Sequence, residues 1–452
     1  MKKYLMRAPS GCFDNPSYFD CISGNMIGDN SGNLLFPHSI SRALMCDDVQ
    51  IDYIKTSNMI DDMKIADINR EYEAFIIPLA NAFRISFINE LTALAYLVSR
   101  LSIPSIVIGV GVNGVIKADD SGEYPFDQAS RLFVKSVLKN SACIGIRGEQ
   151  TAAYLEHLGF VRDQDFMVIG CPSMFLHGAD LPKPRPFTID QDTKVSINSK
   201  AVLPEKLHLF LKDVCDRMPD HYYVPQNIYE FKVLFSGMTI ADTQKTMKIY
   251  KDYPQDLSHP LYRENRVRGF VSAEAWFEYL RGRDLSIGSR IHGNIAAVIS
   301  GTPAFILAPD NRVLELAEYH NLPHTTIADL SKDTNVFDLI RDVNFDQVLD
   351  GHKERFEKYH EFFKRNGLET IYDDPSYSFD TVTAFDKKIA SIDFHGPLVP
   401  LPFAEYDQQM EGIRYLRRQI KNLQKKAKNA PAKLTPKQRL KAVAKKILKP
   451  KK

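Results

Sequence analysis

Two residues near the middle of the second half of the chain, Arg290 and His292, carry side chains suited to binding or converting an anion. A planar guanidinium matches the geometry of a carboxylate or a phosphate. An imidazole can donate to a phosphate oxygen or move a proton near neutral pH. On their own, the two residues are explained equally well by an ion pair of Arg290 with an acid and by a helix cap from His292.

The surrounding pattern predicts the elements that position this pair. Residues 285–288 form a short apolar run typical of a buried strand, Ser289 lies in a tight turn, and a helix is expected over about 292–300. The pair then lies at the carboxyl end of a strand and at the start of a helix. Free N–H groups at a helix start attract anions, and open α/β sheets bind ligands at this edge.

Arg147 repeats this arrangement in the first half of the chain. It follows an expected strand over 142–146 and precedes an expected helix over 149–158. A salt bridge and a ligand contact are equally consistent with this position. Two loops are further candidates for a ligand-facing surface. Gly28 and Asp29 lie in a loop before the helix expected at 34–45, and Asn113 lies in a glycine loop after the strand expected at 106–111.

The sequence resembles the polysaccharide pyruvyl transferase family over most of residues 20–330. The motifs that carry this resemblance are SRIHG (289–293), the following AAVISGTP, the pattern of Asp310, Arg312 and Glu315, and in the first half Gly28-Asp29-Asn30, IPSIVIGVG and CIGIRGEQTAAYLEHLG followed by VIGCPS. The resemblance implies a transferase with two Rossmann-like domains that face a cleft, a GT-B-like arrangement.

The resemblance also implies the reaction and its donor site. Family members transfer a pyruvyl group from phosphoenolpyruvate to a sugar of a cell-surface polysaccharide or its lipid-linked precursor and form a ketal. Arg290 and His292 would contact the donor with the backbone of Ile291 beside them, and Arg147 would be a second donor arginine. His292 would bind phosphate or supply the proton. No cofactor or metal is expected.

The residues leave two other functions open. A GT-B glycosyltransferase that uses a nucleotide sugar would share the fold and the cleft, with Glu315 as a carboxylate for the ribose. A non-catalytic scaffold in glycan assembly is the other alternative. His38, which follows the first loop, is a candidate for proton transfer on the acceptor side.

The length of the chain and the distribution of its charges predict two domains followed by an extension and a basic tail. The expected parts are an N-terminal Rossmann-like domain over 1–180, a second one over 190–345, a helical and irregular extension over 346–405 and a basic amphipathic tail over 406–452. Residues 412–452 hold 16 Lys and Arg and no acid, whereas residues 1–411 hold 42 basic and 56 acidic side chains, a net charge of −14. Six scattered cysteines indicate a reducing cytoplasm.

The basic tail predicts a partner of its own. Apolar residues at heptad-like steps from Met410 to Ala427 suggest a packing helix, and a second basic helix is expected after Thr435. A basic amphipathic segment suits an anionic membrane surface, here the inner face of the membrane. An inert or partner-binding tail is the alternative, and no motif supports nucleic acid binding.

Overall fold

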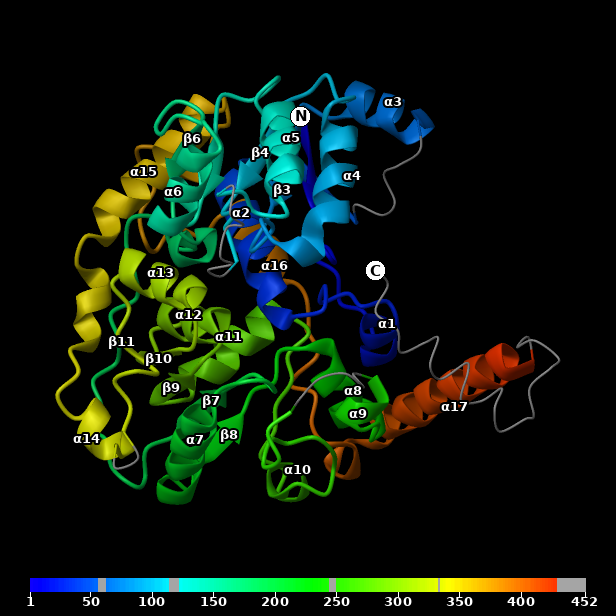
Figure 1. Ribbon diagram of the computed structural model, residues 1–452, viewed down its shortest axis with the longest axis vertical. Coiled ribbons are helices and arrows are strands. Elements are labelled where there is room, and N and C mark those ends of the chain that lie inside the picture. Colours follow the sequence, from blue (N-terminus) through cyan, green and yellow to red (C-terminus); the bar gives the residue numbers. More distant parts are fainter. Residues whose placement is uncertain (56–61, 114–121, 244–248, 332–333, 429–452) are drawn as a thin grey trace.

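The computed structural model describes residues 1–55, 62–113, 122–243, 249–331 and 334–428. It contains parallel β-sheets covered by helices, arranged as two Rossmann-like domains that lie one above the other in Figure 1. The predicted α/β class and the two-domain arrangement are confirmed.

The first sheet belongs to the N-terminal domain and has the order β2-β1-β3-β4, with all pairs parallel. A parallel bridge between Val110 and Ile146 joins it to the pair β5-β6. Strand order reverses between β1 and β3, and such a reversal opens a crevice at the carboxyl ends of the two strands. The strands are β1 Lys2–Arg7, β2 Val49–Ile54, β3 Ala74–Pro78, β4 Ser105–Ile108, β5 Ile144–Ile146 and β6 Phe166–Val168.

The second sheet has the order β11-β10-β9-β7-β8, again with all pairs parallel. Its order reverses between β7 and β9, so the carboxyl ends of these two strands are the expected binding edge. The strands are β7 Val195–Asn198, β8 His221–Tyr223, β9 Leu285–Gly288, β10 Ala304–Ala308 and β11 His324–Thr326.

Helices cover both faces of the sheets, which explains why β3, β4 and β10 are almost continuous apolar runs with every residue buried. In the N-terminal domain the helices are α1 Tyr18–Ser23, α2 Leu35–Leu44, α3 Asp62–Glu71, α4 Ile88–Val98, α5 Asp127–Val137 and α6 Glu149–His157. In the second domain they are α7 Glu205–Arg217, α8 Ile228–Ser236, α9 Ile240–Thr243, α10 Pro260–Arg263, α11 Ala273–Arg281, α12 Ile291–Ile299, α13 Asn311–Tyr319 and α14 Val336–Ile340.

The C-terminal segment adds α15 His352–Arg365, α16 Ala384–Ala390 and α17 Tyr406–Lys428. Helix α15 returns to the N-terminal domain, where Phe356, Tyr359 and Phe362 pack in one buried cluster with Met6 and Ile76 of the first sheet. Short 3-10 helices lie at Ser31–Leu34, Ile85–Phe87, Pro172–Phe175, Phe345–Leu349, Ile371–Asp373 and Leu401–Phe403. Of the helices in the described residues, none is both long and apolar enough to cross a membrane.

Helix α17 confirms the predicted helix but corrects the face by which it packs. Gly412 lies against the carbonyl of Phe235, and Tyr415 is buried between Phe19 and Phe235. The small glycine lets α17 approach the end of α8 closely, so this side becomes the buried one. The predicted apolar stripe is exposed instead, at Met410, Ile413, Ile420 and Leu423, on a helix that projects from the body (Figure 1). The helix expected after Thr435 lies outside the described residues.

His320 connects the two domains at the end of α13. Its Nε2 accepts a hydrogen bond from the backbone N–H of Cys171 at 2.8 Å, just after β6 of the N-terminal domain. The ring is fully buried, and burial together with the charges of Arg355 and His352 holds its pKa well below the usual range. His320 is therefore neutral in the folded protein at neutral pH.

Burial of a neutral His320 predicts a loss of stability in mild acid. The unfolded chain binds a proton at this residue below a pH of about 6.5 whereas the folded chain does not, so the free energy of unfolding falls as pH falls. We expect His320→Gln, which keeps an acceptor near Cys171, to lose about 2 kcal/mol less than wild type between pH 7 and pH 5. Denaturant unfolding at the two pH values checks this, and equal losses in both proteins would contradict it.

Candidate functional site

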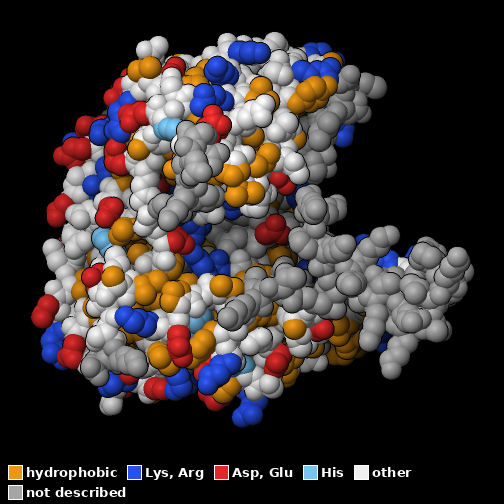
Figure 2. Space-filling view, in the orientation of Figure 1, with side chains coloured by type: hydrophobic (Ala, Val, Ile, Leu, Met, Phe, Trp, Pro, Cys, Tyr) orange, Lys and Arg blue, Asp and Glu red, His pale blue; other side chains and the backbone are white. Residues whose placement is uncertain are grey.

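A cavity of about 670 Å³ lies between the two domains. Its walls come from the carboxyl ends of β1, β3, β7 and β9, the four strands at which the two sheets reverse their order. Figure 2 shows the molecule hollowed between its upper and lower halves, with Lys and Arg side chains inside the hollow. The position agrees with the general location of ligand sites in open α/β sheets.

The turn after β9 supplies four consecutive lining residues, Ser289, Arg290, Ile291 and His292. The turn has this shape because Gly288 has a φ of 155° and lies against the backbone of Asn198, where a Cβ atom would collide with the carbonyl. The Asn198 side chain then accepts a hydrogen bond from the backbone N–H of Arg290 at 2.7 Å. The predicted strand, turn and helix are confirmed, and the first turn of α12 opens on the cavity with N–H groups that lack intrahelical partners.

A buried amide network holds the turn in place from behind. Asn198 donates to Asn294 at 3.0 Å, and Asn294 accepts a second hydrogen bond from Ser286 at 2.9 Å. The Asn294 amide also donates to the carbonyl of Gly288 at 3.0 Å. These side chains are buried and join β7, β9 and α12, so the turn is fixed to two strands and a helix at once.

Arg290 is oriented by one carbonyl and one carboxylate. Its Nε donates to the carbonyl of Ser199 at 2.8 Å, and its Nη2 lies 3.8 Å from Oε2 of the fully buried Glu230. The expectation of an ion pair between Arg290 and an acid is thus partly right. However, 3.8 Å is too long for a hydrogen bond, and the buried Nη2 has no hydrogen-bond partner in the described chain. Arg290 thus lines the cavity with a guanidinium whose hydrogen-bonding capacity is only partly used.

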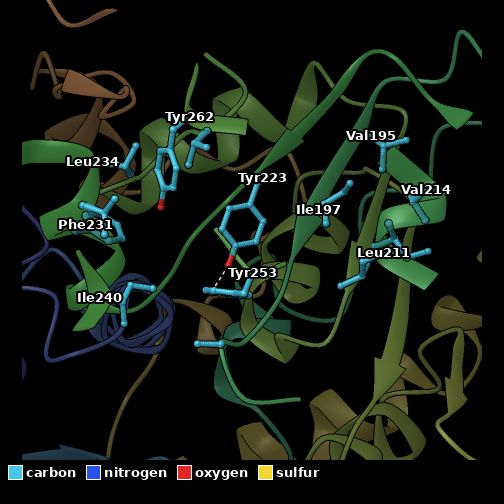
Figure 3. Packing of buried hydrophobic residues seen from close by; sticks show 14 of the residues in the cluster. Val195, Ile197, Leu211, Val214, Tyr223, Phe231, Leu234, Ile240, Tyr253 and Tyr262 are labelled. Atoms are coloured by element: carbon cyan, nitrogen blue, oxygen red, sulfur yellow. Dashed lines mark hydrogen bonds between the residues drawn. The ribbon is translucent and has the colours of Figure 1, made fainter. Parts of the chain in front are cut away.

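Glu230 is itself held by several donors. The hydroxyl of Tyr223 donates to Oε1 at 2.6 Å, Tyr253 also donates to Oε1, and the backbone N–H of Asn227 donates to Oε2 at 2.8 Å. The two tyrosine hydroxyls lie 2.5 Å apart, and a dashed line in Figure 3 marks the hydrogen bond between Tyr223 and Tyr253. Glu230 therefore has little freedom to move closer to Arg290.

His292 lies within α12 and does not cap it, because the N-cap position is Arg290. Its ring lies 5.8 Å from that of Phe36, and a Cβ atom added at Gly32 would lie 2.8 Å from the Cβ and 2.9 Å from the Nδ1 of His292. Burial, followed by the positive charges of Arg147, Arg312 and Arg290, lowers the pKa of His292 to about 3. Among these charges the ring is neutral, and an anion that offsets them will raise its pKa.

Gly28 and Asp29 lie on the opposite wall, as part of a loop of the N-terminal domain. Both residues have a positive φ, and the Asp29 N–H donates to the Asn25 side chain at 2.8 Å. The loop docks on the second domain: Ile228 donates to the carbonyl of Asp29 at 3.0 Å and Ser31 donates to that of Gln226 at 2.8 Å. It closes one end of the cavity.

Arg147 and Asn113 are placed differently from the other predicted site residues. Arg147 lies behind the cavity wall, where it donates to the side chain of Asn81, a lining residue, and its buried Nε lacks a hydrogen-bond partner in the described residues. Burial lowers its pKa to about 10. Asn113 is not among the described residues that line the cavity; its N–H donates to the carbonyl of Phe83 at 3.1 Å.

Two other candidates have different partners. Glu315 accepts hydrogen bonds from the backbone N–H and the hydroxyl of Thr151, at 2.9 and 3.3 Å, so it connects α13 to the start of α6 and does not face the cavity. The expectation that it could bind a ribose is wrong. His38 lies outside the cavity, with its Nε2 3.0 Å from Glu274.

Several lining residues were missed by the sequence analysis. Six cations line the cavity against two acids, Asp29 and Glu90, and Gln226 adds a buried amide nitrogen without a hydrogen-bond partner among the described residues. Ser289, which the sequence analysis already placed in the turn, has a buried hydroxyl that likewise has no hydrogen-bond partner among the described residues. The sequence signal that could have found the other cations is a basic residue shortly after a predicted strand. The sequence analysis applied this signal only to Arg147 and Arg290. The six cations are Arg7, Lys55, Arg84, Lys200, Arg290 and Arg312.

Known proteins of similar fold share little sequence with this chain, and no curated protein matches it. The glycosyltransferase SnogD from Streptomyces nogalater is 10% identical with a TM-score of 0.32, over 80% of this chain and 98% of that chain. The UDP-GlcNAc 2-epimerase from Neisseria meningitidis, bound to UDP-GlcNAc, is 10% identical with a TM-score of 0.36, over 86% and 99%. At these scores the neighbours carry no argument about function.

The family to which the chain belongs follows from its sequence motifs. The sequence model of the polysaccharide pyruvyl transferase family matches residues 30–311, which is more than half of the chain. The match includes the turn with Ser289, Arg290 and His292, and it begins at Asn30, directly after Gly28 and Asp29. This protein is therefore a transferase of the polysaccharide pyruvyl transferase family.

Proposed function

We propose that the protein transfers a pyruvyl group from phosphoenolpyruvate to two hydroxyls of a sugar, in a cell-surface polysaccharide or its lipid-linked precursor, and forms a ketal. The observation that carries this proposal is the cation-lined cavity with buried donors that lack partners at the turn after β9. Phosphoenolpyruvate bears a carboxylate and a phosphate close together. Charge-assisted hydrogen bonds to such groups are the strong ones.

The proposed reaction balances without a further reagent. A proton is added to the methylene carbon of phosphoenolpyruvate, which leaves a cationic centre at the neighbouring carbon. One sugar hydroxyl attacks this carbon and loses its proton. The C–O bond to phosphate then breaks, a second hydroxyl attacks, and its proton is released as the ring closes. The products are the ketal and inorganic phosphate.

The position of each residue in the cavity suggests its role in this reaction. Arg290 and the first turn of α12 bind the donor, while the charges of Arg147 and Arg312 offset the negative charge that it brings. His292 binds the phosphate or supplies the proton to the methylene carbon. Asp29 and Glu90 are the lining carboxylates that could accept a hydroxyl proton. The proposal needs no metal or cofactor for any of these steps.

Donor binding at the turn is the first test. Calorimetric titration should show phosphoenolpyruvate binding to wild type and weaker binding to Arg290→Gln and His292→Gln, by about 1.5–3 kcal/mol each, because each variant removes a charge-assisted hydrogen bond. Arg131→Gln, at a half-buried position on α5 outside the cavity, is the control. Binding of a nucleotide sugar in place of phosphoenolpyruvate would overturn the proposal.

Proton uptake on donor binding tests the role of His292. Its pKa of about 3 in the free protein should rise when phosphoenolpyruvate offsets the surrounding arginines. Binding at pH 7 should therefore take up as much as one proton more in wild type than in His292→Gln, and the wild-type affinity should increase as pH falls. Calorimetry in buffers of different ionisation enthalpy measures the difference. Equal proton counts would remove His292 as the acid.

We also propose that the C-terminal segment binds an anionic membrane surface, on the cytoplasmic side, and so brings the cavity to a lipid-linked acceptor. The support comes from α17, whose exposed apolar stripe includes Ile420 and Leu423. Arg417, Lys421 and Lys425 are exposed on the same half of the helix. Buried apolar area and basic charge both favour such binding.

Vesicle binding by the full chain tests this second proposal. We expect binding to vesicles of equal parts phosphatidylglycerol and phosphatidylcholine, weakening with salt, and little binding to phosphatidylcholine alone. The double variant Ile420→Ser/Leu423→Ser should bind at least about tenfold more weakly, since burial of one such side chain contributes about 1.5–3 kcal/mol. Leu132→Ser, which changes an exposed leucine of α5, is the control. Equal binding by the double variant and the control would contradict the proposal.

A further inference from the structure

Gln226 is a buried glutamine in the wall of the cavity. It follows β8, and only 1% of its surface is exposed. Its carbonyl accepts a hydrogen bond from the backbone N–H of Ser31 at 2.8 Å, and its own N–H donates to Oε2 of Glu230 at 3.3 Å. The side-chain Nε2, in contrast, has no hydrogen-bond partner in the described part of the chain. A buried N–H donor needs an acceptor, and a ligand in the cavity can supply one.

Gly293, the residue after His292, leaves the room that this amide occupies. A Cβ atom added at Gly293 would collide with Nε2 of Gln226. The backbone does not require glycine here, because Gly293 lies within α12 and its φ is not positive. Glycine inside a helix is also less favourable than alanine. The absence of a side chain at Gly293 therefore places the Gln226 amide directly against the first turn of α12.

The same turn carries other donors without a formal charge. No side chain caps α12, and the first N–H groups of a helix have no intrahelical partner. The hydroxyl of Ser289, which also lines the cavity, is buried and has no hydrogen-bond partner within the described residues. The cavity thus offers two kinds of donor near His292. One kind is neutral, and the other is the set of arginines whose charges act on the imidazole.

We infer that Gln226 is a specificity-determining residue whose Nε2 binds the carboxylate of the donor, while the arginines around His292 bind its phosphate. The inference rests on the proposed function for the identity of the donor. A phosphate ester carries up to two negative charges and is drawn more strongly to the arginines than a carboxylate with one. An amide N–H that donates to a carboxylate makes a charge-assisted hydrogen bond. Two anionic groups held at separate points fix the orientation of the three-carbon unit between them.

The test compares two small ligands by titration of the full chain. Phosphoglycolate has the carboxylate and the phosphate of the donor, whereas methyl phosphate lacks the carboxylate. Gln226→Leu should bind phosphoglycolate and phosphoenolpyruvate about tenfold or more weakly than wild type, the loss expected for one charge-assisted hydrogen bond. Its affinity for methyl phosphate should stay within about twofold of wild type. Gln128→Leu, which changes an exposed glutamine of α5 outside the cavity, is the control and should bind all three ligands as wild type does.

Gly293→Ala tests the same contact from the other side. The added methyl group takes the place of the Gln226 amide, and alanine is the better residue within a helix. We expect the same selective loss of phosphoglycolate and phosphoenolpyruvate affinity, with methyl phosphate again within about twofold of wild type. If Gln226→Leu does not fold, because the backbone of Gln226 also holds Ser31 and Glu230, Gly293→Ala decides the result.

The outcomes separate this inference from the proposed function. Wild type that binds phosphoenolpyruvate, with unchanged phosphoglycolate affinity in the variants, would overturn the inference and leave the proposed function standing. A loss for methyl phosphate as large as that for phosphoglycolate would show that Gln226 only supports the fold of the cavity, and it would overturn the inference as well. Wild type that binds neither phosphoenolpyruvate nor phosphoglycolate would overturn the proposed function and this assignment together.

Discussion

Repulsion among the guanidinium groups that converge on His292 is the constraint on which the rest of the cavity depends. Burial, followed by the charges of Arg147, Arg312 and Arg290, lowers the pKa of this one imidazole to about 3. Like charges in a partly dehydrated space are costly unless each is held by an oxygen. The backbone provides some of these oxygens, such as the carbonyl of Ser199 for Arg290 and that of Gly109, 3.5 Å from Nη2 of Arg147.

Carboxylates offset the rest of the positive charge, and the distance between each carboxylate and its cation determines how much it offsets. Glu230 stays 3.8 Å from Arg290, because Tyr223, Tyr253 and the start of α8 already hold it. Asp310 caps α13 through the N–H of Val313 and lies 3.2 Å from Lys200. Carboxylates that accept hydrogen bonds at the start of a helix can reduce the repulsion among the cations without forming close ion pairs with them. The cations that line the cavity are therefore only partly paired with carboxylates, which favours the binding of an anion there.

The sequence predicts those parts of this site that depend on local periodicity. The strand 285–288, the turn and the following helix can be deduced because apolar runs and glycines mark them, and Arg290 and His292 are then placed by their neighbours in sequence. Glu230 and Gln226 cannot be found in this way, since they reach the turn only through the pairing of β7 with β8 and β9. The sequence analysis did not predict strand β2, although VQIDYI alternates apolar and polar residues at the edge of its sheet and this alternation is typical of a strand. The packing face of α17 was misjudged because a glycine, not an apolar residue, determines its closest approach.

Direct contacts between the two domains hold the walls of the cavity in place. Glu315 of one domain binds the start of α6 in the other, and His320 accepts the N–H of Cys171. The loop with Asp29 bonds to Ile228 through the backbone. Separating the domains would replace these hydrogen bonds by hydrogen bonds to water, at a net cost of about 0.5–1.5 kcal/mol for each bond. Since residues of both domains line the cavity, these contacts also fix the turn after β9 relative to the carboxyl ends of β1 and β3.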